Sequence, residues 1–232
     1  MERRNATAGD RLRELTPARV ALGRAGHSLP TRELLAFQLA HARARDAVWR
    51  ALDPGLLSEL HPIYLRSAAR DRATYLRRPD LGRRLEEGTR LERGDWDAVI
   101  VVADGLSATA VHRHAGVVIG ALRPLIADWR VAICVVEQGR VAIGDEIGER
   151  MGAKMAVMLI GERPGLSSPD SLGAYLTWSP RVGRTDAERN CVSNIRTEGL
   201  DPELAARRIA GILRAARELG LTGIGLNLQP LE

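Results

Sequence analysis

The stretch DAVIVVADGLS (97–107) places an unbroken apolar run, residues 98–103, directly before a polar turn that contains glycine. Two similar runs follow, VAICVV (131–136) and MAVMLI (155–160). Apolar runs without a polar face are typical of strands that are buried on both faces, as in a parallel sheet. We therefore expect the second half of the chain to be built on a mostly parallel sheet.

Helical segments are expected between and after these strands. The expected helices are Ser107 to about Ala121, Asp145 to about Met151, Pro169 to about Leu176, and Pro202 to Leu219, and a last strand is expected at GIGLN (223–227). Alternating strands and helices with short links predict an α/β fold. Its expected form is a Rossmann-like, mostly parallel sheet with helices on both faces.

The expected secondary structure changes near Glu92. Before it the sequence indicates helices and loops with no convincing strand, and the longest helix is expected from Thr31 to about Leu52. The apolar stripe of that helix has little of its own chain to cover it, which is typical of a surface that packs on another protein. We interpret residues 1–92 as a helical N-terminal extension and residues 93–232 as a Rossmann-like domain.

Composition narrows the possible partners. The 232 residues carry a formal net charge of +5, but Lys154 is the only lysine and acids are interleaved with the arginines. Aromatic residues make up 3% of the chain, so the stacking platforms of single-strand binders are lacking. No apolar run approaches the roughly 18 residues of a membrane span. We expect a cytoplasmic protein that binds neither nucleic acid nor membrane.

Common nucleotide and hydrolase motifs are missing. The sequence has no G-x-G-x-x-G after its first strand, no phosphate-binding P-loop and no G-x-S-x-G elbow. Ser107 is interpreted as a helix N-cap. Cys134 and Cys191 lie in different settings and do not form a disulfide framework or a zinc site.

Polar turns with glycine follow the expected strands. These turns are 104–107, 137–140, 161–165 and, with less support from the pattern, 189–194. Ligands of open parallel sheets bind beyond the carboxyl ends of the strands, so Asp104, Gly105, Leu106 and Ser107 are candidates on location. The alternative, that these residues only form turns and caps, stays open.

Several longer stretches resemble the small-subunit family of ethanolamine ammonia-lyase. They are TPARVALGRAG (16–26), LLAFQLAHARARDAV (34–48), YLRRPDLGRRL (75–85), VADGLSATAV (102–111), EQGRVAIGDEIGERMGAK (137–154), LIGERPGLSSPDSLGAYLTWSPR (159–181) and DAERNCVSNIRTEGL (186–200). The resemblance covers nearly the whole chain, and the motifs occur in the same order as in the family.

The resemblance implies a function shared between two chains. The family's enzyme converts ethanolamine to acetaldehyde and ammonia with adenosylcobalamin, which carries the radical chemistry. Catalytic residues belong to a large subunit, on which residues 1–92 are expected to dock in a hetero-oligomer, while residues 93–232 bind cobalamin. In some bacteria the enzyme lies inside a protein microcompartment, but residues 1–15 contain no readable encapsulation signal.

The resemblance also implies three cobalamin contacts, which are Val141, Glu162 and Cys191. Glu162 would accept hydrogen bonds from amide side chains of the corrin, and Val141 would make an apolar contact. All three are expected just past strand ends. The alternatives are a salt bridge from Glu162 to Arg163 or another nearby arginine, and plain packing for Cys191. No residue of this chain is expected to be catalytic or to bind a metal.

The chain also lacks D-x-H-x-x-G, the motif with which other cobalamin domains replace the cofactor's own base by a histidine. We therefore expect cobalamin to bind base-on. Two other hypotheses remain: a stand-alone Rossmann-like enzyme that uses Asp104, Glu162 and Cys191 itself, and a purely structural subunit whose site has decayed.

Overall fold

The structure is a computed structural model that describes residues 8–16 and 18–226 and contains one six-stranded sheet, ordered β1-β3-β2-β4-β5-β6. The strands are β1 (Ile63–Arg66), β2 (Ala98–Ala103), β3 (Val131–Glu137), β4 (Met155–Gly161), β5 (Leu172–Trp178) and β6 (Arg189–Ile195). Strands β1, β3, β2 and β4 pair in parallel, whereas β5 is antiparallel to both β4 and β6. Only β5 therefore runs against the other strands of this mixed sheet.

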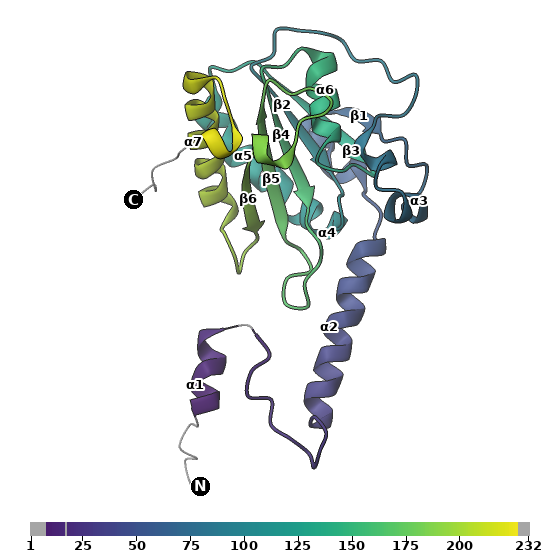
Figure 1. Cartoon of the computed structure of the whole chain (residues 1–232), viewed down its shortest axis with the longest axis vertical. Coiled ribbons are helices and arrows are strands. Elements are labelled where there is room, and N and C mark those ends of the chain that lie inside the picture. Colours follow the sequence, from purple (N-terminus) through teal and green to yellow (C-terminus); the bar gives the residue numbers. More distant parts are fainter. Residues whose placement is uncertain (1–7, 17, 227–232) are drawn as a thin grey trace.

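Helices cover both faces of the sheet, so the chain has the α/β fold that its sequence predicts (Figure 1). The α-helices are α1 (Ala8–Leu15), α2 (Thr31–Trp49), α3 (Arg72–Arg77), α4 (Ala108–Ala110), α5 (Gly116–Leu122), α6 (Ile143–Met151) and α7 (Pro202–Leu219). A π-helical turn, η3 (Val111–Ala115), joins α4 to α5. The short 3-10 helices are η1 (Pro54–Leu60), η2 (Leu81–Arg83), η4 (Arg123–Ile126), η5 (Asp186–Glu188) and η6 (Gly223–Gly225).

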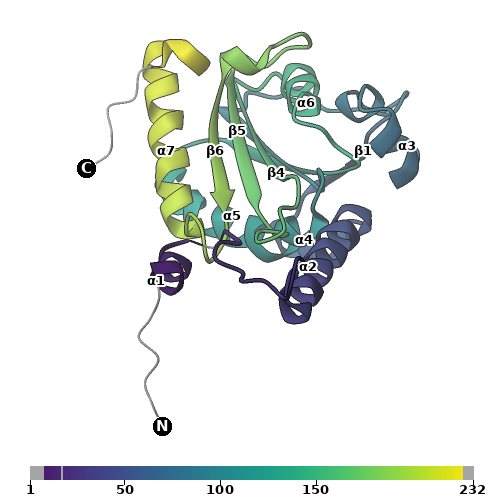
Figure 2. The ribbon, with the colours of Figure 1, turned by 60° about the horizontal axis from the view of Figure 1, so that its bottom comes forward.

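Side-chain alternation along β2 divides the core into two layers. Ile100 and Val102 pack with residues of α5 and α7, whereas Val99 and Val101 pack with residues of α6. Figure 2 shows α7 and α6 on opposite sides of the sheet. All residues of β2 are buried, which explains why this strand reads as a continuous apolar run.

Most of the expected elements are confirmed. The three apolar runs form β2, β3 and β4, and helices occur where they were expected at 31–49, 143–151 and 202–219. Ser107 caps the first turn of α4, since its side chain accepts a hydrogen bond from the backbone amide of Ala110.

Two expected elements are wrong. The helix expected from Pro169 to Leu176 is instead strand β5, because Leu172, Ala174 and Leu176 all face the core layer of α5 and α7 in a period of two. The strand expected at 223–227 is not formed within the described residues: residues 223–225 form the 3-10 helix η6, Leu226 follows it as its C-cap, and residue 227 lies outside the described residues. Gly223 there has a positive φ of 85°.

Two further expectations need correction. The N-terminal part does contain a strand, β1, which forms one edge of the sheet by pairing with β3. The stretch 189–194, expected as a turn after a strand, is most of strand β6 itself. The boundary drawn at residue 92 stays a prediction, although β1 places part of the N-terminal segment inside the sheet.

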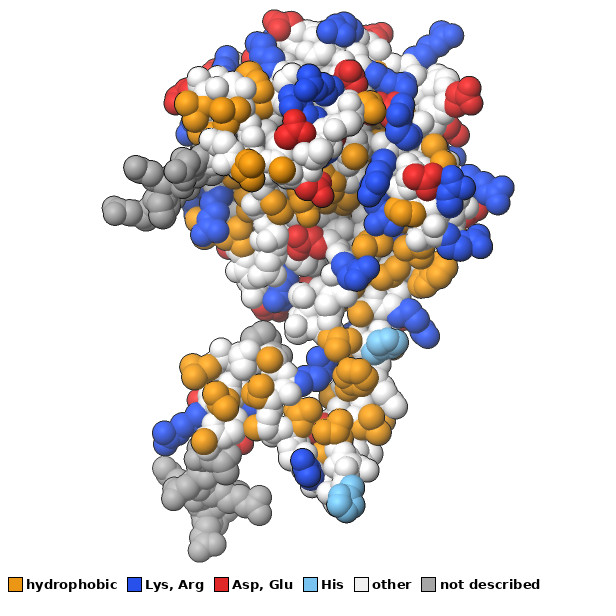
Figure 3. All heavy atoms as spheres, viewed as in Figure 1, with side chains coloured by type: hydrophobic (Ala, Val, Ile, Leu, Met, Phe, Trp, Pro, Cys, Tyr) orange, Lys and Arg blue, Asp and Glu red, His pale blue; other side chains and the backbone are white. Residues whose placement is uncertain are grey.

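Helix α2 projects away from the body of the molecule (Figure 1). Ala47, in its last turn, is its only buried residue. The apolar side chains of this part of the chain stay exposed, and they include Leu12, Leu15, Leu34, Leu35, Phe37 and Leu39. Figure 3 shows apolar side chains gathered over the α1 and α2 region. Among the described helices, none is long and apolar enough to cross a bilayer.

Candidate binding site

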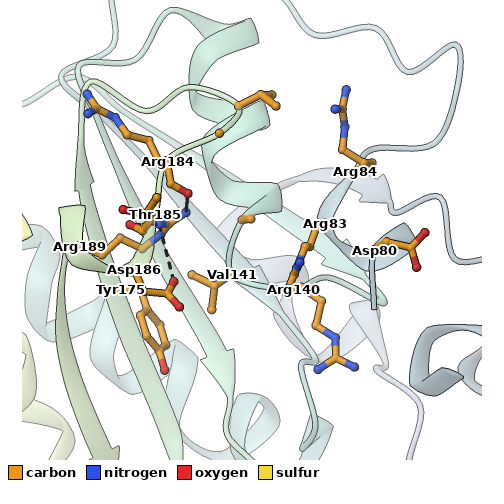
Figure 4. Close-up of a pocket in the computed structure, with 13 residues that line it drawn as sticks. Asp80, Arg83, Arg84, Arg140, Val141, Tyr175, Arg184, Thr185, Asp186 and Arg189 are labelled. Carbon is orange, nitrogen blue, oxygen red and sulfur yellow. Dashed lines mark hydrogen bonds and ion pairs between the residues drawn. The ribbon is translucent and has the colours of Figure 1, made fainter. Parts of the chain in front are cut away.

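Two neighbouring hollows, of about 740 and 420 Å³, lie beside the turn that follows β3. Arg140, Val141 and Tyr175 line both of them. Figure 4 shows Val141 in the larger hollow, between Tyr175 and Arg189 on one side and Arg83 on the other. The smaller hollow is also lined by Glu162. Two of the three expected contact residues, Val141 and Glu162, therefore share one hollow.

Val141 is placed by a turn that several side chains hold. The backbone amide of Gly139 donates to Asp104 Oδ1 over 3.2 Å, and the Gly139 carbonyl accepts from the Tyr75 hydroxyl over 3.1 Å. The next amide, of Arg140, donates to the Gly82 carbonyl over 2.7 Å. These contacts fix the backbone immediately before Val141, so its side chain is held at the hollow.

Tyr75 forms the support beneath this turn. Its ring is fully buried, and the guanidinium groups of Arg140 and Arg72 lie over it at 4.2 and 4.7 Å from the centroid. A side chain at Gly82 would collide with it, because an added Cβ would lie 2.9 Å from the Tyr75 ring. Burial raises the pKa of the Tyr75 hydroxyl, so the hydroxyl stays a neutral donor to Gly139.

Glu162 follows β4 directly and binds the ends of two other segments. Its Oε2 accepts from the hydroxyl of Ser171 over 2.5 Å and from the backbone amide of Asn194 over 3.2 Å. Within the described part of the chain it makes no ion pair, so the salt bridge to Arg163 is not formed. Gly173 leaves room for this carboxylate, since an added Cβ would lie 2.9 Å from Oε1.

Cys191 lies in the middle of β6 rather than past a strand end, which corrects the expectation. It pairs with Tyr175 of β5, and the two side chains interact by a hydrogen bond. Cys191 as a whole residue is exposed, but desolvation of its thiol by neighbouring groups raises the thiol pKa, and the Glu162 carboxylate raises it further, against the hydrogen bond with Tyr175. The thiol is thus neutral and a poor nucleophile. Both Cys134 and Cys191 are free.

The turn after β2 serves mainly to hold the fold together. Asp104 is buried in an ion pair with Arg72, and burial raises the pKa of its carboxyl to about 6. Ser107 donates to the Pro169 carbonyl over 2.8 Å in addition to capping α4. Gly105 has little room for a side chain, because an added Cβ would lie 2.2 Å from the Gly161 carbonyl oxygen. Of these candidates, Gly105 and Leu106 line the smaller hollow.

The larger hollow contains residues that sequence reasoning missed. Its basic side chains are Arg83, Arg84, Arg140, Arg184 and Arg189. They come from three segments far apart in the chain, and the sequence has 34 basic residues spread along its length. No local pattern separates these five from the rest, so only the tertiary fold brings them together.

Comparison with known proteins assigns the chain to a family. The model of the family described as "Ethanolamine ammonia-lyase light chain (EutC)" matches residues 6–227. The ethanolamine ammonia-lyase small subunit of Azotobacter vinelandii is 56% identical over 232 residues, covering 93% of this chain and 86% of the relative. The subunit of the same name from Ralstonia nicotianae is 56% identical over 222 residues, covering 88% and 82%.

Proposed function

The chain belongs to the ethanolamine ammonia-lyase light chain family, and we propose that it is the small subunit of an adenosylcobalamin-dependent lyase. The complex would convert ethanolamine to acetaldehyde and ammonia. In this proposal the chain binds cobalamin at its interface with a catalytic large subunit, in the cytoplasm or, where a bacterium builds one, inside a microcompartment. The observation that carries the proposal is the hollow shared by Val141 and Glu162.

The residues of the smaller hollow fit a corrinoid. Leu106, Val141 and Ile160 offer apolar surface for the face of the macrocycle. Glu162 offers carboxylate lone pairs to the amide side chains at the rim of a corrin, since an ionised carboxylate accepts several hydrogen bonds. Cys191 lines neither hollow, but it pairs with Tyr175, which lines both. A corrinoid is larger than this hollow, so part of it would be left for a second subunit to cover.

Bound adenosylcobalamin supplies radical chemistry through its cobalt–carbon bond. The contribution of this chain is to bind and orient the cofactor. Ser107 is buried and already donates to Pro169, and the raised pKa of Cys191 keeps its thiol protonated. Neither is suited to be a nucleophile, which supports placing the catalytic residues on the large subunit.

The proposal includes base-on binding, because the chain lacks the D-x-H-x-x-G motif. Electron paramagnetic resonance of Co(II) in the complex distinguishes the two modes. Hyperfine coupling to a nitrogen of dimethylbenzimidazole is expected. If the nitrogen hyperfine coupling instead changes when the histidines of the protein are labelled with ¹⁵N, a protein histidine is bound to cobalt and base-on binding is overturned.

Reconstitution of the complex tests the proposed function. Ethanolamine deamination is measured with added adenosylcobalamin for this chain, for its large subunit, and for both together. Activity in the mixture alone is expected. Activity of the isolated chain would instead favour the stand-alone enzyme, and full activity of the large subunit alone would refute an obligate role.

A further inference from the structure

The larger hollow is rich in positive charge. Five arginine side chains and two aspartate side chains, Asp80 and Asp186, line it. Asp80 is already engaged by Arg78, at 2.6 Å, and Asp186 is 98% exposed at the rim, so neither fills the hollow with negative charge. The wall facing an occupant is therefore cationic.

Three of the five arginines have carboxylate partners. Arg84 pairs with Glu146 at 2.9 Å, Arg184 with Glu188, and Arg189 with Asp145. These pairs hold the walls of the hollow in place but leave little charge free for a ligand.

Arg83 and Arg140 are different, because within the described residues neither has an ion-pair partner. Arg140 is held by its stacking on Tyr75 and by a 3.4 Å hydrogen bond to the Tyr75 carbonyl, while its Nε is buried without any partner. Because no carboxylate in the described part of the chain neutralises either guanidinium, both charges are left to pair with an anionic ligand.

Helix α6 adds to the positive potential. Val141 and Ala142, immediately before its first residue, line the hollow, so the positive end of the helix faces an occupant. Guanidinium groups together with a helix N-terminus favour a phosphate group, whose oxygens accept paired hydrogen bonds from arginine.

We propose that Arg83 and Arg140 bind the phosphate of the nucleotide tail of cobalamin, in the hollow next to the one that holds the corrin. This inference rests on the proposed function. It explains why Arg140, Val141 and Tyr175 line both hollows, since the tail leaves the corrin rim and passes from one hollow to the other. The ligand class is a phosphate ester that is covalently joined to the corrinoid.

The test uses the complex of this chain with its large subunit and measures binding by equilibrium dialysis. Three corrinoids are compared in their cyano forms: cobinamide, which lacks the phosphate, cobinamide phosphate, which ends at it, and cobalamin. The variants are Arg83→Gln and Arg140→Gln. Arg77→Gln is the control, because Arg77 is exposed and lies outside the hollow.

Wild type and control are expected to bind cobinamide phosphate about tenfold more tightly than cobinamide, as one charged hydrogen-bonded pair implies. Arg83→Gln is expected to lose most of that advantage while binding cobinamide as wild type does, because Arg83 lines the larger hollow alone. Its unchanged affinity for cobinamide shows that the variant is folded. Arg140→Gln is expected to weaken cobinamide phosphate more than cobinamide, because Arg140 lines both hollows. Inorganic phosphate is expected to compete with cobinamide phosphate and not with cobinamide.

The inference would be overturned if the variants lost affinity for cobinamide and cobinamide phosphate equally, or lost affinity for neither. Inorganic phosphate that binds at Arg83 without displacing cobinamide phosphate would also overturn it, because the hollow would then be a site for free phosphate. Failure of the proposed function looks different, since wild type would then bind none of the three corrinoids.

Discussion

The guanidinium of Arg72 donates a 3.1 Å hydrogen bond to the carboxylate of Asp104, and their side chains are 9% and 0% exposed. The same guanidinium also donates to the Val48 carbonyl in the last turn of α2, over 2.7 Å, and to the Gln138 side chain, over 3.2 Å. One residue thus ties the projecting helix, the carboxyl end of β2 and the turn before Val141. The position of the binding site depends on this junction.

Replacing Arg72 by methionine should destabilise the chain. The change leaves the Asp104 carboxylate buried without its ion-pair partner, and breaking a buried pair costs about 3–5 kcal/mol. Urea unfolding at neutral pH measures the loss. Arg70→Met is the control, because Arg70 is 84% exposed and its ion pair with Asp71 contributes little. Equal stability of the two variants would show that the junction is unimportant.

The cost of Arg72→Met should depend on pH. Burial raises the pKa of Asp104 to about 6, and Arg72 opposes that rise, so the variant has an even higher carboxyl pKa. A carboxyl whose folded pKa exceeds its unfolded value makes the folded chain bind more protons between the two values, so stability falls as pH rises through that window.

In the folded variant, Asp104 stays protonated at low pH. The full free-energy cost of burying its charge arises only at a pH at which the carboxyl ionises. We therefore expect the loss of unfolding free energy from Arg72→Met to be larger at about pH 8 than at about pH 5. Unfolding curves of wild type and variant at both values measure this. A loss that is constant with pH would contradict the buried carboxylate as its cause.

The central strands could be predicted from sequence because each is buried along its whole length. Residues 98–103 lie between two core layers, and no polar residue interrupts them. Strand β5 could not be predicted in this way. Pro169 resembles a helix start, and the following residues become a strand only because β4 and β6 pair with both of their edges. Tertiary pairing here overrides the local signal.

The site was predictable only in part, for a similar reason. Val141 and Glu162 follow strands whose carboxyl ends share one edge, so topology alone brings them close. Tyr75 supports the turn from a segment more than 60 residues earlier, as its contact with Gly139 shows. Pairing across such a separation leaves no trace in a single sequence.

Gly161→Ala should be strongly destabilising. The added Cβ would lie 2.1 Å from the Ser107 carbonyl oxygen, so the backbone of β4 or of the turn before α4 would have to move. We expect a loss of about 2 kcal/mol or more, in the range of overpacked sites. Gly120→Ala is the matched control, because an added Cβ there meets nothing within 4 Å and lies in a helix, where alanine adds about 0.5–1 kcal/mol. Thermal unfolding separates the two changes, and similar melting temperatures would contradict the close packing.

Glu162→Ala should weaken corrinoid binding by the complex about tenfold, as expected for losing a charged acceptor. Glu162→Gln should weaken it less, because its amide oxygen still accepts a hydrogen bond. Cys191→Ser should have little effect, since Cys191 lines neither hollow. Dialysis against cyanocobalamin gives the affinities, with Glu87→Ala, an exposed site outside both hollows, as control. Unchanged affinity in Glu162→Ala would revive the structural subunit with a decayed site.

The exposed face of α2 should be required for assembly with the large subunit. Leu35 and Leu39 are 58% and 52% exposed and are four residues apart, so they lie on one face of the helix. Leu35→Glu together with Leu39→Glu should abolish co-purification with the large subunit, because docking would bury two charges in an apolar contact. Deleting residues 1–50 should have the same effect but also removes the Val48 carbonyl that accepts from Arg72, so the point variants are the sharper test.

Leu219→Glu is the control for this assembly experiment, because Leu219 is 60% exposed at the end of α7, on a different part of the surface. It should leave co-purification intact. Urea unfolding of the free chain should give the same free energy for the α2 double variant and wild type, since both leucines are exposed before docking. Loss of co-purification with unchanged stability then assigns the effect to docking. Retained co-purification would mean that the large subunit binds another surface and that α2 projects for a different reason.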